Sequence, residues 1–195
     1  MSNSDNKQIV LHPSHADYEI KKSQFIGAIM PCDNEREAMQ QLRLLATQHP
    51  NANHLAFAWR IRQEDGFINE RCNDAGEPSG TAGRPILAPL EGNNIINAVA
   101  GVIRYFGGIK LGTGGLARAY GTAAKLAIES ATLSPWVQMS ELILDIEYSQ
   151  LQLLEYQLKQ CQGKIIDQQF SERVLVTISL PTREYTQIKD QFSGY

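Results

Sequence analysis

The chain has 195 residues, of which 43% are hydrophobic and 20% charged, and this composition suits a globular protein with one large domain or two small ones. Its net charge of −3 gives no global attraction to nucleic acid, and no apolar run approaches the ~20 residues that a membrane helix needs. The polar N-terminus has no secretory signal core, and three scattered cysteines form no disulfide framework. We therefore expect a reduced, cytoplasmic protein, and the four histidines, which lack ligand spacing, suggest no metal and no cofactor.

The first part of the chain predicts an α/β domain over residues 15–135, with the first fourteen residues frayed. Residues 17–32 are rich in β-branched and aromatic side chains, which predicts two strands or one long bent strand. Asp33 or Asn34 is expected to cap the helix EREAMQQLRLLATQ, which ends before Pro50. The segments NHLAFAWRI and FINERC then predict a β-hairpin.

Residues 73–85, NDAGEPSGTAGRP, predict a loop, and ILAPLEGN after it predicts a short helix. The segment IINAVAGVIRYF has almost no polar residues, which is typical of a strand buried on both faces or of a buried helix. Its isoleucine and valine content favours the strand. A helix is expected from about 114 to 131, with small residues on its inner face that predict close packing against a sheet: Leu116, Ala119, Ala123, Leu126 and Ala127.

Residues 105–116, YFGGIKLGTGGL, link the buried strand to this helix, and five of the twelve are glycine. One interpretation is an anion site, in which backbone amides from Gly112 to Leu116 form a helix N-terminus that favours phosphate. The other is a tight strand-to-helix turn that needs positive φ angles. The sequence leaves both open, because GTGG matches neither a dinucleotide fingerprint nor a P-loop.

The charge pattern predicts a local basic surface around this loop, because no acidic residue occurs between Glu91 and Glu129. The candidate residues for binding an anion or nucleic acid are Arg104, Gly107, Gly108, Lys110, Gly112, Thr113, Gly114, Gly115, Arg118 and Lys125. Tyr105, Phe106 and Tyr120 are candidate stacking surfaces for single-stranded RNA. Phe106 lies just after a buried strand, which favours a role in the core. For Tyr120 the core role and the stacking role both stay open.

The loop NDAGEPSGTAGRP carries a second group of candidates, namely Asp74, Glu77, Ser79, Thr81 and Arg84. Paired carboxylates can act as acid and base, but no histidine or lysine is near in sequence and the composition is also typical of a turn. The two acids could instead bind a cationic partner, or hydrogen-bond Arg84 or Arg104 within the domain. We assign no catalytic residue, and expect His54, within a strand, to be a hydrogen-bonded residue of the core or its rim.

Residues 139–195 predict a second domain with the order strand, helix, strand, strand, helix. Ser149 is expected to cap its first helix and Thr182 its second. This order is a ferredoxin-like unit that lacks its last strand, so we expect the natural chain to continue by roughly six residues and a turn. The short polar connection over residues 132–140 predicts two domains that pack weakly and move relative to each other.

The motif NDAGEPSGTAGRP, followed by VIRYFGGIKLGTGGLARAYG, resembles the bacterial YigZ-type branch of the IMPACT family. The resemblance implies an α+β protein whose N-terminal domain is similar to the second domain of a small-subunit ribosomal protein. It also implies a C-terminal ferredoxin-like domain similar to the fifth domain of elongation factor G. Eukaryotic relatives regulate a starvation-sensing translation kinase by binding its activator, but they lack this C-terminal domain, so that role is not carried over.

From these features we expect a non-enzymatic binding or regulatory protein linked to translation or RNA, which uses the glycine loop and the basic helix face. Its expected partners are RNA or a ribosome-associated protein, and not a membrane. One alternative is a binder or enzyme for a phosphate-containing small molecule at the same loop. The other is a pure protein–protein interaction module.

Overall fold

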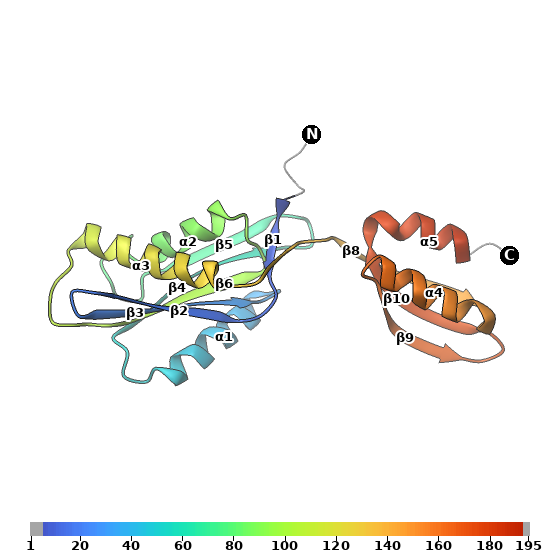
Figure 1. Ribbon diagram of the computed structural model, residues 1–195, viewed down its shortest axis with the longest axis horizontal. Helices are drawn as coiled ribbons and strands as arrows, with labels where there is room; N and C mark the ends of the chain where they lie inside the picture. Colours follow the sequence, from blue (N-terminus) through green and yellow to red (C-terminus); the bar gives the residue numbers. More distant parts are fainter. Residues whose placement is uncertain (1–5, 193–195) are drawn as a thin grey trace. The chain divides into compact units, whose positions relative to one another are not determined.

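The computed structural model describes residues 6–192 and divides the chain into two compact units, the first ending at Trp136 and the second beginning at Val137. Each unit combines helices with an antiparallel sheet and has its own hydrophobic core (Figure 1). The chain is therefore a two-domain protein of the α+β class.

The first unit is built on a five-stranded antiparallel sheet with the order β2-β3-β6-β4-β5. The central strand β6 is buried along almost its whole length, which confirms the strand interpretation of its apolar run. A tight turn separates β2 from β3, which confirms the two-strand alternative for residues 17–32. The strands are β2 (Ser14–Ile20), β3 (Ser23–Pro31), β4 (His54–Arg62), β5 (Ile68–Asn73) and β6 (Ala98–Tyr105).

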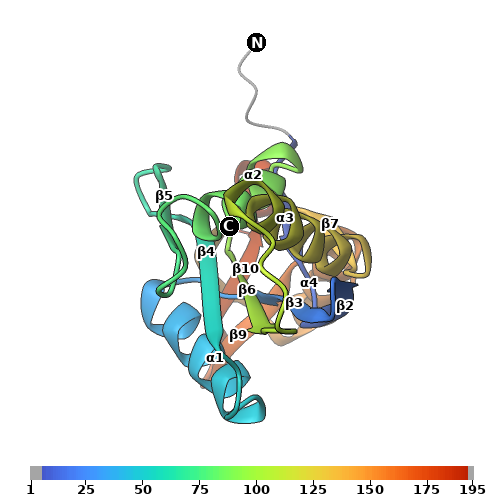
Figure 2. The ribbon, with the colours of Figure 1, turned by 90° about the vertical axis from the view of Figure 1, so that its left-hand side faces the viewer.

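Helices cover both faces of this sheet (Figure 2). Helix α1 (Glu35–Gln48) lies on one face, and helices α2 (Gly83–Gly92) and α3 (Thr113–Glu129) lie on the other. The cap of α1 is Asn34, whose side chain accepts the Glu37 amide at 2.9 Å. The Glu37 carboxylate in turn accepts the Asp33 amide at 2.8 Å, so the helix start is closed in both directions.

Helix α3 packs very closely on β3, as its small inner residues predict. A Cβ atom on Gly27 of β3 would lie 2.2 Å from the Ala123 carbonyl oxygen, so only glycine fits there. Ala119, Ala123 and Ala127 are fully buried, whereas Leu126 is only half-buried.

The ends of the first unit are more ordered than the sequence indicates. Strand β1 (Gln8–Val10) pairs with β7 (Leu133–Pro135), so the expectation of a frayed start is wrong for these residues. Trp136 follows directly, and its ring lies 4.6 Å from the Arg62 guanidinium carbon. The predicted connection over residues 132–140 is therefore mostly part of the first unit.

The second unit has the predicted order, with three antiparallel strands arranged as β8-β10-β9. Alternating residues of β8 and β10 are buried against the two helices. Glu147 and Gln150, and not Ser149, form a capping box at the start of α4, and a 3₁₀ turn over Thr182–Glu184 precedes α5. The elements are β8 (Met139–Ile146), α4 (Tyr148–Gln160), β9 (Lys164–Phe170), β10 (Val174–Pro181) and α5 (Tyr185–Phe192). Within residues 137–192, the second edge of β8 has no partner strand.

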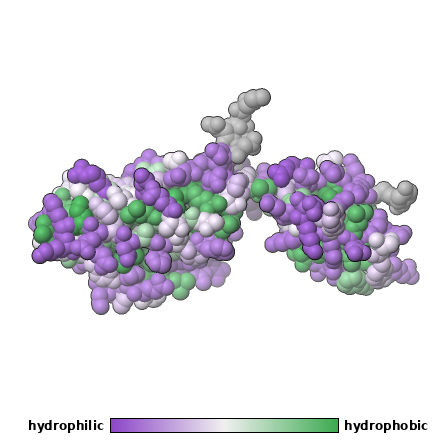
Figure 3. All heavy atoms as spheres, viewed as in Figure 1, coloured by the Kyte–Doolittle hydropathy of each residue, from purple (hydrophilic) through white to green (hydrophobic). Residues whose placement is uncertain are grey.

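Hydrophilic residues cover most of the visible face of each unit, with small hydrophobic patches between them (Figure 3). No helix within residues 6–192 is long and apolar enough to cross a membrane.

Candidate nucleic-acid interface

Two loops meet at one end of the five-stranded sheet (Figure 1). One is the turn between β2 and β3, which contains Lys21 and Lys22, and the other is the glycine loop between β6 and α3. A Cβ atom on Gly107 would lie 2.0 Å from the Lys22 carbonyl carbon, and the Gly107 amide donates to Ser23 Oγ at 3.1 Å. The close backbone approach requires glycine and brings the two lysines beside the glycine loop.

The turn and the helix N-terminus are both present in the glycine loop. Gly108 and Gly112 have φ angles of 86° and 73°, which a strand-to-helix turn requires here. The first helical hydrogen bond of α3 joins the Leu116 amide to the Gly112 carbonyl. The amides from Thr113 to Gly115 donate to no acceptor within residues 6–192, and residues 112–114 are exposed. Because an N-terminus with free amides attracts negative charge, the turn geometry does not exclude the anion interpretation.

Four exposed cations lie on these two loops and on α3, and we call them the cationic end: Lys21, Lys22, Lys110 and Arg118. None of the four forms an ion pair with any residue that the structure describes. Arg118 Nη1 lies 3.8 Å from the point where a Cβ on Gly114 would stand, which places the guanidinium at the first turn of α3. Lys125 lies two turns further along and pairs with Glu129 at 3.6 Å, so its charge is partly compensated.

Arg104 is not part of this surface, contrary to its place among the candidates. It is 6% exposed, and its Nη1 donates to Glu77 Oε1 at 2.5 Å. The reason is its position on the central strand β6, on the face that α3 covers. Its Nε is buried and has no acceptor within the described residues.

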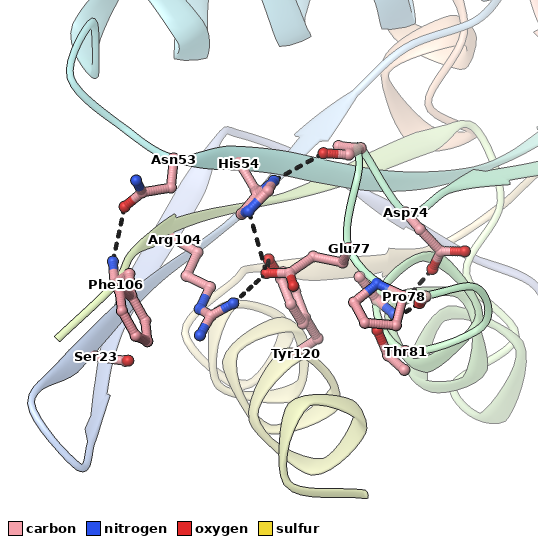
Figure 4. A network of polar contacts seen from close by, with 12 residues as sticks. Ser23, Asn53, His54, Asp74, Glu77, Pro78, Thr81, Arg104, Phe106 and Tyr120 are labelled. Atoms are coloured by element: carbon pink, nitrogen blue, oxygen red, sulfur yellow. Dashed lines mark hydrogen bonds and ion pairs between the residues drawn. The ribbon is translucent and has the colours of Figure 1, made fainter. Parts of the chain in front are cut away.

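Glu77 is the centre of a buried polar network (Figure 4). Its Oε1 also accepts the Tyr120 hydroxyl at 2.8 Å, and His54 Nε2 lies 3.8 Å away. His54 Nδ1 lies 2.8 Å from the Ala75 carbonyl oxygen, which gives this half-buried histidine the expected partner. Burial raises the pKa of Tyr120, and the hydrogen bond to Glu77 raises it further. The network fixes the loop after β5 to β4, β6 and α3.

Tyr120 is fully buried in this network, so it is not a stacking surface. Phe106 is the reverse case, because it is 47% exposed although its position favours the core. Its amide donates to Asn53 Oδ1 at 2.8 Å, which fixes the backbone just beyond the end of β6.

Asp74 serves as a remote cap for α2. Its carboxylate accepts the amides of Gly80, Ala82 and Gly83 at 2.8–2.9 Å. Burial alone would raise the pKa of Asp74, but the three amide hydrogen bonds outweigh burial and hold the pKa below its usual value. Asp74 and Glu77 thus both bind donors of their own chain, and the geometry does not favour the paired acid–base interpretation.

The other loop candidates also have local roles. The Thr81 hydroxyl donates to the Pro78 carbonyl at 2.6 Å, and Arg84 pairs with Glu91 at 3.5 Å on the surface. Ser79 is exposed. Of the two internal partners proposed for the acids, Arg104 is therefore the one that Glu77 binds, and Arg84 is not.

The role of Asp74 predicts a pH-dependent effect. Because its pKa is lower in the folded chain than in the unfolded chain, its contribution is present near neutral pH and is lost as the pH falls through the folded-state value. Asp74→Ala is expected to lower the free energy of unfolding by about 1–2 kcal/mol at pH 7. In urea titrations, this difference from the wild type should shrink at pH 3. Asp17→Ala, at an exposed aspartate of β2, is the control, and an equal loss for Asp74→Ala at both pH values would contradict the assignment.

The comparisons with known proteins identify the family. The profile of the Impact N-terminal domain matches residues 21–128, which is more than half of the chain, and a domain of unknown function, DUF1949, matches residues 144–193. The chain therefore belongs to the IMPACT family, which confirms the resemblance seen in its motifs.

The relatives match along most of their length. The chain is 37% identical over 177 residues to the IMPACT family member YigZ of Escherichia coli (strain K12), covering 91% of this chain and 87% of the relative. It is 36% identical over 155 residues to the IMPACT family member YvyE of Bacillus subtilis (strain 168), covering 80% of this chain and 70% of the relative. A crystal structure described as that of a hypothetical protein is 36% identical, with a TM-score of 0.71, and the match covers 96% of this chain and 91% of that chain.

Local sequence patterns do not indicate every residue of the candidate site. The pattern over residues 17–32 predicts strands without placing Lys21 and Lys22 in a turn, and no pattern predicts the hydrogen bonds of Asn53 and Ser23. The two adjacent lysines between apolar stretches were a usable signal for an exposed turn. The contact of Lys22 with Gly107 depends on the pairing of β3 with β6, which no local pattern indicates.

Proposed function

We propose that this chain is a non-enzymatic binding or regulatory protein of the translation or RNA environment, and that it contacts RNA through the cationic end. The observation that carries the proposal is the packing of Gly107 on Lys22, which brings the turn with Lys21 and Lys22 against the glycine loop with Lys110 that leads into α3. The link to translation rests on membership of the IMPACT family and on the proposed likeness of the two units to domains of a ribosomal protein and of elongation factor G.

The chemistry of the cationic end suits a phosphate backbone. Lysine and arginine side chains that neutralise phosphates supply most sequence-independent affinity for nucleic acid. The free amides at the start of α3 add donors that favour an anion. The cations are spread over a turn, a loop and a helix, and this arrangement suits a ligand with several phosphates more than a ligand with one.

A pair of matched double variants tests the proposal. Lys110→Glu with Arg118→Glu reverses two charges of the cationic end, and we expect at least a tenfold loss of affinity for a labelled single-stranded oligoribonucleotide in fluorescence anisotropy. Arg36→Glu with Arg43→Glu makes the same charge change at exposed positions of α1, on the other face of the sheet.

The control pair should retain most of the affinity, and both variants should melt within a few degrees of the wild type because all four side chains are exposed. Equal losses in the two variants would show that only net charge matters and would contradict the proposed surface. No measurable binding of the wild-type chain to RNA would contradict the proposed function itself.

A further inference from the structure

Phe106 is an exposed aromatic ring at the cationic end, and the backbone that carries it is fixed. Its amide is bound to Asn53 Oδ1, and the next amide, of Gly107, is bound to Ser23 Oγ. Two consecutive hydrogen bonds therefore hold the residue against β3 and the start of β4. An aromatic side chain in an ordinary flexible loop has no such support.

The buried Arg104 guanidinium lies against the ring of Phe106. The Arg104 guanidinium carbon lies 5.4 Å from the centre of the Phe106 ring and 5.5 Å from that of Phe25. Arg104 is held in turn by Glu77, and Glu77 by the Tyr120 hydroxyl (Figure 4). The Phe106 ring thus rests on an immobilised guanidinium and is still nearly half exposed. Its position is set before any ligand arrives, which lowers the entropy cost of stacking on it.

We propose that Phe106 is a stacking platform for one unpaired base of a single-stranded RNA, whose neighbouring phosphates bind Lys22 and Lys110. This inference rests on the proposed function and names the class of RNA. An aromatic face accepts any base, whereas the bases of a duplex are already stacked and paired and do not reach a single ring. The exposed cations on the same loops supply the phosphate contacts that an isolated aromatic residue lacks.

The test compares one substitution at two exposed phenylalanines. Phe106→Leu removes the aromatic face and keeps an apolar side chain, and Phe67→Leu does the same in the turn between β4 and β5. The register of His54 with Arg104 and of Arg60 with Ala98 places that turn at the other end of the sheet. Phe106→Tyr is the conservative variant, because it keeps the ring.

Anisotropy titrations would use three labelled ligands: a single-stranded RNA, the same strand in a duplex, and a strand of equal length with an abasic stretch. We expect Phe106→Leu to weaken binding of the single-stranded RNA by about tenfold and to leave the affinities for the other two ligands within a factor of two. Phe67→Leu and Phe106→Tyr should match the wild type on all three ligands.

An equal loss on all three ligands would overturn the stacking role, since it would indicate a structural role for the ring. Unchanged RNA binding by Phe106→Leu would also overturn it and would assign the ring to a protein partner or to no partner. In either case a loss of RNA affinity in Lys110→Glu with Arg118→Glu would leave the proposed function standing, so the two proposals fail separately.

Discussion

Replacing Glu77 by glutamine is expected to lower the free energy of unfolding by about 3–5 kcal/mol. The side chain keeps its size but loses its charge, so the buried Arg104 guanidinium has no counter-charge, and its Nε already lacks an acceptor within the described residues. An isolated buried cation is far more costly than either member of a paired set. Urea unfolding followed by circular dichroism measures the loss.

A double-mutant cycle separates this pair from ordinary surface charges. Arg104→Met should also be strongly destabilising, but Glu77→Gln with Arg104→Met should cost clearly less than the sum of the two single changes. Glu91→Gln removes an exposed partner of Arg84 and should cost less than about 1 kcal/mol. If Glu77→Gln were as stable as the wild type, the network would not be what fixes the loop after β5.

Gly107→Ala is expected to damage both stability and binding, although it changes no charge. The added Cβ would overlap the Lys22 carbonyl group at 2.0 Å, so the turn between β2 and β3 must move away from the glycine loop. We expect a loss of about 1–3 kcal/mol in the free energy of unfolding. RNA affinity should fall toward that of Lys110→Glu with Arg118→Glu, because the lysines of the turn separate from the rest of the cationic end.

Gly114→Ala is the matched control for Gly107→Ala. A Cβ at Gly114 has the Arg118 guanidinium 3.8 Å away as its nearest neighbour, and the residue lies in the first turn of a helix, where alanine is favourable. This variant should keep its RNA affinity and be at least as stable as the wild type. Equal behaviour of the two alanine variants would contradict the role given to the contact between Gly107 and Lys22.

The parts of the fold that local patterns specify were predictable. The apolar run of β6, the period of α1 and the small inner face of α3 each determine one element without reference to the others. The pairing of β1 with β7 was not predictable, because two three-residue strands more than a hundred residues apart carry no periodic signal. The cap of α4 is Glu147 and not the expected Ser149, because the helix starts earlier than its apolar period indicates.

The candidate site was predictable only in part, because the placement of several residues depends on contacts between segments that lie far apart in the sequence. The exposure of Lys110 and Arg118 follows from their loop and helix positions. Arg104 was expected on the surface but is buried, because it pairs with Glu77 in a distant loop. Phe106 was expected in the core but is exposed, because it lies just past the end of β6. Lys21 and Lys22 lie beside the glycine loop because of the register between β3 and β6, which is set by the whole sheet.

The salt dependence of RNA binding tests the central claim, that the cationic end holds a phosphate backbone, most directly. The affinity of the wild-type chain for a single-stranded oligoribonucleotide would be measured from about 50 to 200 mM salt. Four phosphate contacts predict a slope near −3 for log affinity against log salt, from about −0.7 per contact. Lys110→Glu with Arg118→Glu should reduce the steepness of the slope by at least one unit, whereas Arg36→Glu with Arg43→Glu should leave it unchanged. A wild-type slope near zero, or a slope that the first variant does not alter, would contradict the account.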